Sequence, residues 1–214
     1  MKLHSIVFLA LAVLSLLDVR YVRADSADLW ESPASKGSAG YNRVLNAIKI
    51  KKPVTKQFVQ QKKMVSLGRT LNSKGLIYIS PDGICWKTTE PFVSSMKISK
   101  EGIEQQQADG KREFKHSRGS MQVKYMVKIM LAMFIADMAV LEQEFDLFFL
   151  KSGSSWRLGL KPKRKMIKKV FSSVIISGSK SVEKIVIKQP GGDESQIDMS
   201  NSDSTELTLM SCVK

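Results

Sequence analysis

The chain has 214 residues and a formal net charge of +14 at pH 7, because 34 Lys and Arg residues outnumber 20 Asp and Glu residues. Its two His and two Cys residues leave little material for a metal centre or a nucleophilic enzyme. The positive charge indicates either a solvated basic face or attraction to anionic lipid head groups or an acidic docking surface.

The N-terminus has the pattern of a secretory signal peptide. Lys2 adds positive charge, residues 6–17 are apolar or small, and residues 22–24 fit a small-x-small cleavage site. The apolar run is too short for a membrane anchor, which needs about 20 residues. We therefore expect a signal peptide over residues 1–24 and a single exported domain over residues 25–214.

The first part of that domain is predicted to contain one helix and a meander. Apolar side chains at helical spacing predict a helix over residues 41–48, and Pro53 ends it. Gly102, Asp109 and Gly110 are expected to mark looser turns. Between Pro53 and Gly102, short segments bounded by Gly, Pro, Asn or Asp indicate antiparallel strands. We expect these strands at residues 58–67, 75–80, 84–89 and 93–99.

The longest periodic segment covers residues 120–149. Its apolar side chains recur at steps of three or four, the period of one helix face, at Met126, Met130, Met133, Phe134, Met138, Leu141 and Phe145. Asp137 falls on the same face, so the pattern predicts either one helix with a polar interruption or two helices broken near Asp137. A core helix explains the segment better than a membrane span does. Flexible Met side chains would also suit a lipid pocket, whose apolar shape changes.

The C-terminal third is predicted to form a second meander. Its strands are expected at residues 156–160, 170–177, 182–188 and 196–200. Trp156 and Leu158 alternate with polar or small residues, so one face there should be apolar. The basic run 161–169 has two interpretations. It is either a solvated turn or a docking surface for anionic lipid or an acidic transporter face, centred on Lys163, Arg164 and Lys165.

Cys85 and Cys212 are the only cysteines of the sequence. An exported protein meets an oxidising compartment, where a disulfide can form. The sequence leaves two alternatives open: two free thiols, or a bridge that ties down the C-terminal tail.

The order of several motifs points to one family. The stretch "FVQQKKMVSLGRTLNSKGLIYISPDGICWKTTEPF" is followed by "SSWRLGLKPK" and "IVIKQPGGDESQIDMSN". The key positions of the first stretch are Phe58, Gln60, Gly75, Pro81, Gly83, Trp86 and Pro91. Together these residues resemble the outer-membrane lipoprotein carrier (LolA-like) family, whose pattern is F-x-Q, a Ser/Gly-led strand, a Pro-containing turn ending in Trp, and a further Pro. The resemblance covers about residues 40–200.

The resemblance implies an α+β fold: a curved, incomplete antiparallel β-barrel with helices covering its concave face and an apolar cavity between them. We expect the cargo-binding residues to be Phe58, Tyr78, Trp86, Met130, Met133, Phe134, Met138, Trp156 and Leu158. In the family's best-known members an Arg precedes the Pro of the hairpin and helps to hold the helical lid shut. That position is Ser80 here, so the sequence does not show how the lid is held.

The function implied is that of a periplasmic carrier. It would shelter the acyl chains of a lipoprotein or another lipid or glycolipid, receive this cargo from an inner-membrane transporter, and pass it towards an outer-membrane acceptor. The phosphate-binding motif G-x-x-x-x-G-K-[ST] is absent from the sequence, so transfer would proceed without nucleotide hydrolysis. We expect a monomer without cofactor, metal or nucleic acid.

Two alternatives to a carrier are an exported hydrolase and a membrane-associated acceptor or scaffold of similar fold. An enzyme is disfavoured because the exported domain has a single histidine, His116, in a charged stretch without a second His or Cys at ligand spacing. Asp82, Glu90 and Asp193 lie in turn contexts, where carboxylates commonly bond to backbone. The acceptor is disfavoured because no Cys for acylation follows the apolar N-terminal run.

Overall fold

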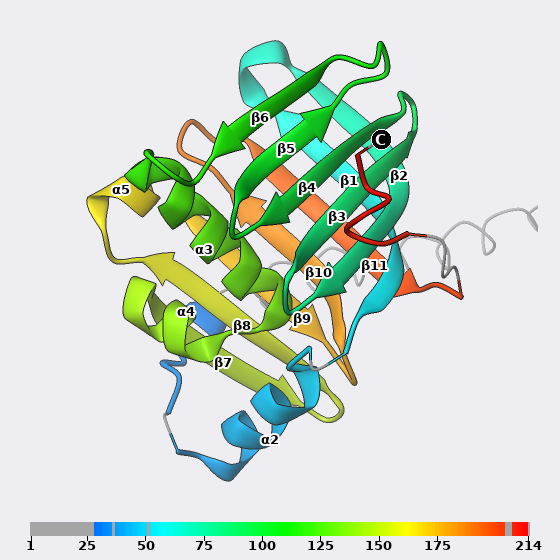
Figure 1. The fold of residues 1–214 in the computed structure, drawn as a ribbon. Coiled ribbons are helices and arrows are strands. Elements are labelled where there is room, and N and C mark those ends of the chain that lie inside the picture. The colour runs from blue at the N-terminus through cyan, green and yellow to red at the C-terminus, as the bar shows by residue number, and fades with distance from the viewer. Residues whose placement is uncertain (1–27, 36, 51, 204–206, 214) are drawn as a thin grey trace, which may run out of the picture.

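The computed structural model describes residues 28–35, 37–50, 52–203 and 207–213. The predicted signal peptide lies outside these residues. Over the described part of the chain, eleven strands form one antiparallel sheet in the order β6-β5-β4-β3-β2-β1-β11-β10-β9-β8-β7 (Figure 1). The first six strands are β1 (Val54–Met64), β2 (Arg69–Ser80), β3 (Gly83–Glu90), β4 (Ser94–Ser99), β5 (Gly102–Gln106) and β6 (Arg112–His116). The others are β7 (Phe145–Ser152), β8 (Ser155–Pro162), β9 (Ser173–Gly178), β10 (Val182–Lys188) and β11 (Glu194–Asn201).

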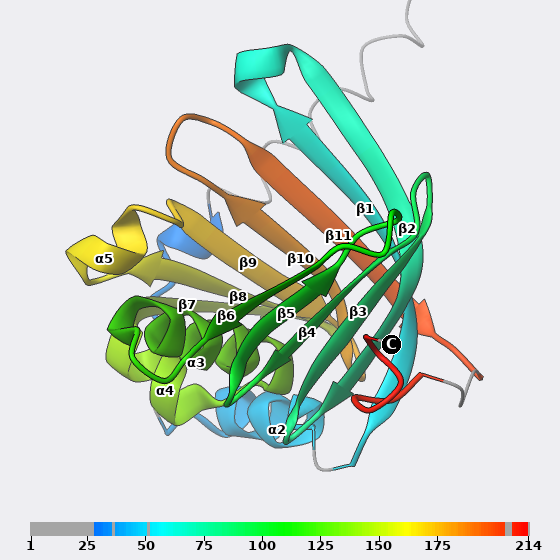
Figure 2. The same ribbon diagram turned by 45° about the horizontal axis from the view of Figure 1, so that its top comes forward.

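The helices lie on one side of this sheet, which curves around them without closing (Figure 2). The described helices are α2 (Ala39–Ile48), α3 (Met121–Ile135), α4 (Met138–Glu144) and α5 (Lys165–Lys168), with a short 3-10 turn, η1, over Val65–Leu67. None of them is long and apolar enough to cross a membrane. The predicted fold class, an incomplete antiparallel barrel with helices over its concave face, is confirmed.

The long periodic segment forms two helices, as the second of the two alternatives predicted. α3 ends where Ala136 adopts a left-handed conformation with φ 55°. Asp137 then begins α4, because its carboxylate accepts a hydrogen bond from the backbone N–H of Val140 at 3.4 Å. The expected continuation through Phe145 was wrong, since α4 ends at Glu144 and β7 begins at the next residue. Apolar residues at steps of three or four also fit a short strand that follows a helix.

The turn expected at Asp109 and Gly110 is confirmed, whereas the one expected at Gly102 was wrong and the strands β5 and β6 were not predicted. Gly102 opens β5, and Asp109 and Gly110 lie in the turn between β5 and β6. These two strands escaped prediction because they are short and polar, and all five side chains of β6 are exposed. A strand at a sheet edge needs little apolar alternation, since the ladder to its neighbour supplies the pairing.

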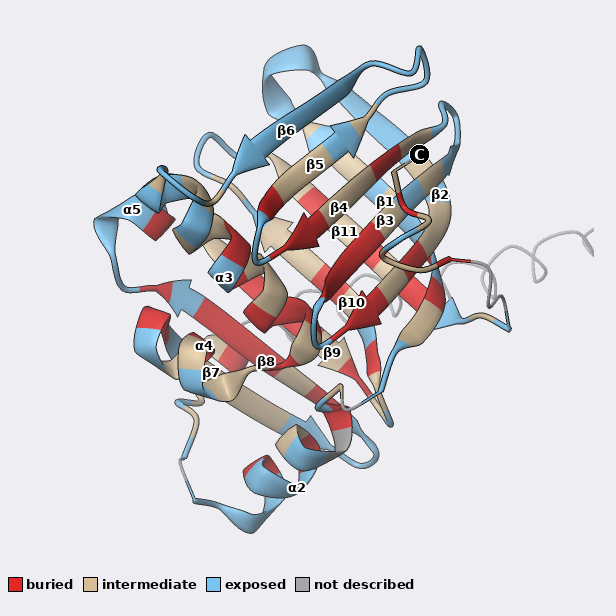
Figure 3. Ribbon diagram, in the orientation of Figure 1, coloured by how far each residue is buried: buried red, intermediate tan, exposed pale blue. Residues whose placement is uncertain are grey.

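The register divides the sheet into two faces. Trp86 pairs with Met96 across β3 and β4, and both pack in the apolar core under the helices. Their neighbours Cys85 and Lys97 also pair and therefore point to the opposite face, because successive side chains of a strand alternate. We call these the inner and outer faces. Figure 3 shows buried residues concentrated where the sheet meets α3 and α4, whereas β6 and the far end of the β1–β2 hairpin are exposed.

A disulfide fastens the C-terminal tail to the outer face. Cys85 and Cys212 are bonded, with their Cα atoms 5.6 Å apart. The tail residues Leu207 and Leu209 pack beside this bridge, and the cluster also contains Leu76, Tyr78 and Val213. The structure thus selects the bridged alternative, and this second apolar cluster is separate from the core under the helices.

The two edges of the sheet differ. At the β7 edge, the backbone N–H of Ala34 donates to the Leu147 carbonyl oxygen at 2.9 Å, and the N–H of Phe149 donates to the Ser32 carbonyl oxygen at 2.9 Å. This short segment covers the edge. At the other end, no described segment pairs with the free side of β6.

Candidate cargo-binding site

Aromatic side chains join the inner face of the sheet to helix α3. The rings of Phe58 on β1 and Trp86 on β3 have centroids 4.3 Å apart. Trp86 in turn meets Phe134 on α3 edge-on, with centroids 6.0 Å apart. Two strands on either side of β2 and a helix thus contribute to one apolar contact region between sheet and helices.

Eight of the nine predicted cargo residues belong to this region. They all lie in the same apolar cluster: Phe58, Trp86, Met130, Met133, Phe134, Met138, Trp156 and Leu158. Five are buried, and Trp86, Met130 and Met138 are partly exposed. The helix side chains pack directly on the sheet.

Tyr78 lies elsewhere, which corrects its expected position. It points to the outer face and packs in the cluster under the C-terminal tail. Its neighbours Ile77 and Ile79 point inward and are buried in the main core. The sequence pattern around residue 78 is apolar on both faces, and only the position of the tail explains why.

A buried lysine on the inner face was missed by the sequence analysis. Lys56 pairs with Ile77, whose side chain lies in the main core, and is only 5% exposed. Its ammonium donates to the Val182 carbonyl oxygen at 2.9 Å and to Ser181 Oγ at 3.0 Å. Burial lowers the pKa of Lys56. The only sequence signal was its place in the alternation, two residues before Phe58 on the same face.

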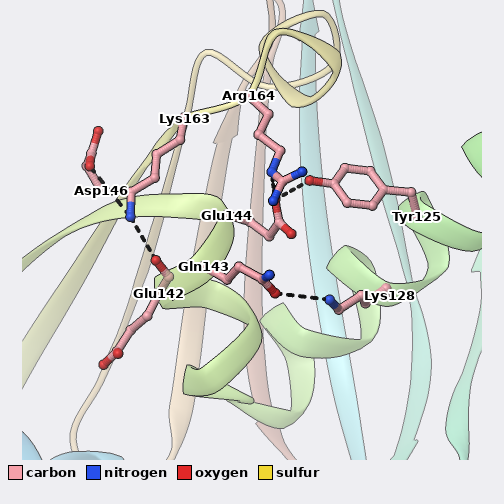
Figure 4. A network of polar contacts seen from close by, with 8 residues as sticks. All are labelled: Tyr125, Lys128, Glu142, Gln143, Glu144, Asp146, Lys163 and Arg164. Carbon is pink, nitrogen blue, oxygen red and sulfur yellow. Dashed lines mark hydrogen bonds and ion pairs between the residues drawn. The ribbon is translucent and has the colours of Figure 1, made fainter.

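A polar clasp fastens the helices to the strand β8 and its following loop (Figure 4). We define the clasp as Tyr125 of α3, Glu144 at the end of α4, and Arg164 just before α5. The Glu144 carboxylate accepts hydrogen bonds from the Tyr125 hydroxyl and from Arg164, whose Nε lies 2.9 Å from Glu144 Oε2. The Glu144 side chain is 2% exposed, so these partners replace the water that the charge has lost.

Neighbouring contacts reinforce the same junction. The Lys163 ammonium donates to the Glu142 carbonyl oxygen at 2.8 Å and lies 3.8 Å from the Asp146 carboxylate. Lys128 of α3 donates to Gln143 of α4 at 3.3 Å. Figure 4 shows these bonds converging where α3, α4 and the loop before α5 meet.

The clasp also bears on the residues predicted for lid closure and docking. Ser80, at the place of the family Arg, donates to the Gly83 carbonyl oxygen at 3.0 Å within its own turn, so the clasp holds the helices by other residues. Lys163 and Arg164, predicted to dock a partner, also contact the residues at the end of α4. Lys165 is exposed and is the position where docking can be tested without breaking the clasp.

We expect Arg164→Met to lower the free energy of unfolding by about 1–3 kcal/mol, because it leaves the Glu144 charge with one partner fewer. The loss stays below that of a fully buried pair because the Arg164 side chain is 55% exposed. In a Glu144→Gln background the same change should cost much less, since no buried charge remains. Urea unfolding of the four proteins measures the coupling. Equal losses in both backgrounds would show that Arg164 acts through another contact.

The clasp should also weaken at high pH. Burial, and then the hydrogen bond to Glu144, raise the pKa of Tyr125 from 10.0 to about 12. The folded state therefore holds this proton more tightly than the unfolded chain, and stability should fall as the pH rises from 10.0 towards about 12. Thermal melts across this range should show a shallower fall for Tyr125→Phe than for the wild type. Parallel curves would mean that Tyr125 titrates alike in both states.

Among the described residues, no group of three or more His, Cys, Asp or Glu side chains is placed to hold a metal ion. The ring of His116 contacts that of Phe114 at a tilt, with ring centroids 3.9 Å apart, at the exposed edge strand β6 rather than in the cargo region. The chemistry that this region offers is apolar contact, with polar groups that fasten its cover.

No protein-family model matches the chain, and no curated protein matches it. Similar solved structures include a LolA superfamily protein, NE2245, from Nitrosomonas europaea, with 10% identity, a TM-score of 0.41, and coverage of 81% of this chain and 97% of that one. A DUF1329 family protein from Desulfovibrio piger has 12% identity, a TM-score of 0.44, and coverage of 79% and 94%.

A third structure is an outer membrane lipoprotein-sorting protein domain from Vibrio parahaemolyticus, with 9% identity, a TM-score of 0.39, and coverage of 78% and 92%. Two of these three are named for the carrier family that the sequence motifs resemble. At such identities and TM-scores the likenesses carry no functional argument, so the proposals below rest on residues of this chain.

Proposed function

We propose that this protein is a carrier that shelters acyl chains between the inner face of its sheet and the helices α3 and α4. One observation carries the proposal. An apolar cluster on the inner face of the sheet is covered by a Met-rich helix that takes no part in the strand ladder and is fastened by a polar clasp. Such a cover can separate from the sheet without breaking strand pairing, and Met side chains adapt to the cargo that enters.

The physical need for a carrier is large. Burying a methylene group contributes about 0.8 kcal/mol of favourable free energy. Moving an acyl chain of about 15 methylenes from a membrane into water therefore costs about 12 kcal/mol. The inner face would replace the membrane during transit. The same aromatic and Met side chains that pack on each other in the closed form would then contact the cargo.

The cargo is an acylated molecule: a lipoprotein or another lipid or glycolipid. The carrier acts as an exported monomer in the periplasm, without a catalytic step or cofactor, and moves its cargo towards the outer membrane. An inner-membrane transporter would load it and an outer-membrane acceptor would unload it. Without nucleotide hydrolysis, transfer follows the relative affinities of donor, carrier and acceptor.

Mass spectrometry of a solvent extract from natively purified protein tests the proposal. We expect acyl lipid to co-purify, and an apolar fluorescent probe such as N-phenyl-1-naphthylamine to bind the delipidated protein and be displaced by fatty acid. A protein that yields no lipid and binds no probe would remove the carrier function.

A second candidate, a membrane-associated acceptor of similar fold, is favoured by one feature. The tip of the β1–β2 hairpin exposes Val65, Leu67 and Leu71, which are each about half exposed. Lys63 and Arg69 beside them are also exposed, and apolar side chains flanked by basic ones suit a membrane interface. If Leu67→Asp abolished vesicle binding while lipid uptake stayed unchanged, the acceptor role would be supported.

A further inference from the structure

A groove of about 1060 Å³ lies at the rim of the sheet, away from the cargo region. It is formed by the ends of β4, β5 and β6, the loop after β6, and the first turn of α3. We call it the rim groove. None of the predicted cargo residues lines it.

The rim groove opens on the outer face of the sheet. Lys97 pairs with Glu104, and Glu104 pairs with Phe114. Lys97 is itself the partner of Cys85, which points outward beneath the C-terminal tail. Cross-strand partners share a face, so these groove residues point away from the cargo region. A ligand in the groove would therefore leave the cargo region free.

The rim groove is rich in positive charge. It is lined by Lys97, Lys100, Arg118 and Lys124. In the part of the chain that the structure describes, neither Arg118 nor Lys124 forms an ion pair. The first turn of α3 contains no acidic residue, so the partial positive charge of the helix N-terminus adds to the field.

The acidic side chains of the groove do not cancel this charge. Glu101 accepts a hydrogen bond from Ser99 Oγ at 2.6 Å and lies 4.0 Å from the Lys100 ammonium. The bond from Ser99, followed by smaller contributions that include Lys100 and Lys97, lowers the pKa of Glu101. The groove is lined by four basic side chains and by two acidic ones, Glu101 and Glu104, which leaves an excess of positive charge.

Exposed apolar side chains stand among these cations. Met121, the first residue of α3, is 76% exposed, and Phe114 on β6 is 42% exposed. Both line the groove. Apolar side chains gain free energy when they enter the boundary between head groups and acyl chains, and nearby Lys and Arg residues are attracted to anionic lipids.

We propose that the rim groove docks the protein on a bilayer surface that contains anionic lipid. A phosphate-bearing head group would lie among Lys97, Arg118 and Lys124, with Met121 and Phe114 at the acyl boundary. This inference rests on the proposed carrier function and deepens it. Because α3 begins at the groove and its other end covers the inner face, docking would bring the start of the lid to the membrane that supplies or receives the cargo.

Sedimentation with phosphatidylcholine vesicles that contain about 30% phosphatidylglycerol tests the docking. The wild type should bind them, should bind pure phosphatidylcholine vesicles far less, and should be released as salt rises to about 0.5 M. Replacing Arg118 and Lys124 with Gln should weaken binding about 30-fold, because each basic residue near an anionic surface contributes about a five-fold factor.

A matched control is the double replacement Lys49→Gln and Lys180→Gln. These lysines are exposed and lie outside the groove lining. Their replacement removes the same total charge as the groove variant does, so the control should bind like the wild type. Met121→Ser should weaken binding several-fold while leaving its salt dependence unchanged, because it removes an apolar contact and no charge. Circular dichroism should show that all variants remain folded, since every replaced side chain is exposed.

The proposal is overturned if the wild type ignores anionic vesicles, or if the groove variant and the control lose binding equally. The first result would leave an acidic protein surface as the partner of these cations. The second would show that binding depends on the net charge of the protein and not on the groove. Lipid extraction and probe titration of the same groove variant separate this inference from the carrier function. We expect both to match the wild type, so either idea can fail alone.

Discussion

Phe134→Asp is expected to weaken the binding of lipid and of an apolar probe strongly while the domain stays folded. Phe134 is 6% exposed and meets Trp86 of the sheet, so the new carboxylate would be buried without a partner, at a cost of several kcal/mol. Two responses can relieve this cost: unfolding of the domain, or separation of α3 from the sheet. The second is favoured because α3 contributes nothing to the strand ladder.

The size of the binding loss follows from the same contact. Exchanging the phenyl ring for a charge removes about 2–3 kcal/mol of apolar contact with the cargo, so affinity should fall about 30-fold or more. Probe titration measures the affinity. Circular dichroism and thermal melts, run in parallel, show whether the fold survives.

Leu160→Asp is the control for an ordinary core position. Leu160 is 0% exposed and lies within β8, where it pairs with Leu147 of β7 and Val174 of β9, so its replacement should unfold the domain. If Phe134→Asp lost its fold in the same way as Leu160→Asp, the contact between α3 and the sheet would be a fixed core rather than a cover that opens.

Removing the disulfide should cause a large loss of stability while the domain can still fold. The bridge joins residues separated by 127 positions, and the chain-entropy model assigns about 4–5 kcal/mol to closing a loop of this length. We expect the double variant Cys85→Ala and Cys212→Ala to lose about this amount in urea unfolding. The tail residues 207–213 should also become accessible to proteases.

The wild type unfolded and refolded with a reductant provides the control, because it removes the bridge without changing a side chain's volume. It should match the double variant within about 1 kcal/mol. If both retained full stability, the packing of Leu207 and Leu209 on the outer face would suffice to hold the tail. We expect the free energy contributed by this packing alone to be small, since Leu209 is only partly buried.

Local pattern was a good guide where one face of an element is buried. The helix at residues 41–48 lies within α2, and Trp156 and Leu158 point to the apolar face as their alternation predicts. The family resemblance carried by the motifs around Phe58 and Trp86 predicted the open curved sheet, and these residues form the aromatic contact between the sheet and α3. The spacing of apolar residues predicts such elements correctly because burial of one face imposes that spacing on the sequence.

Elements that obtain their stability from distant partners escaped prediction. The polar strand β6 pairs only with β5, and the first residues of β7 continue the helical spacing of α4. Lys56 is buried because Ser181 and Val182 accept its hydrogen bonds across a gap of more than 120 positions. A local window of sequence cannot contain such a partner.

By itself the sequence determined the alternating apolar faces, the Met-rich helical segment and the excess of positive charge, because each depends on neighbours along the chain. Only the tertiary structure decided that Cys85 bonds to Cys212, that Tyr78 lies under the tail, and that Glu144 gathers Tyr125 and Arg164 into a clasp. These contacts join residues from elements that meet only after the sheet has curved, so their energies depend on burial and geometry that no local pattern encodes.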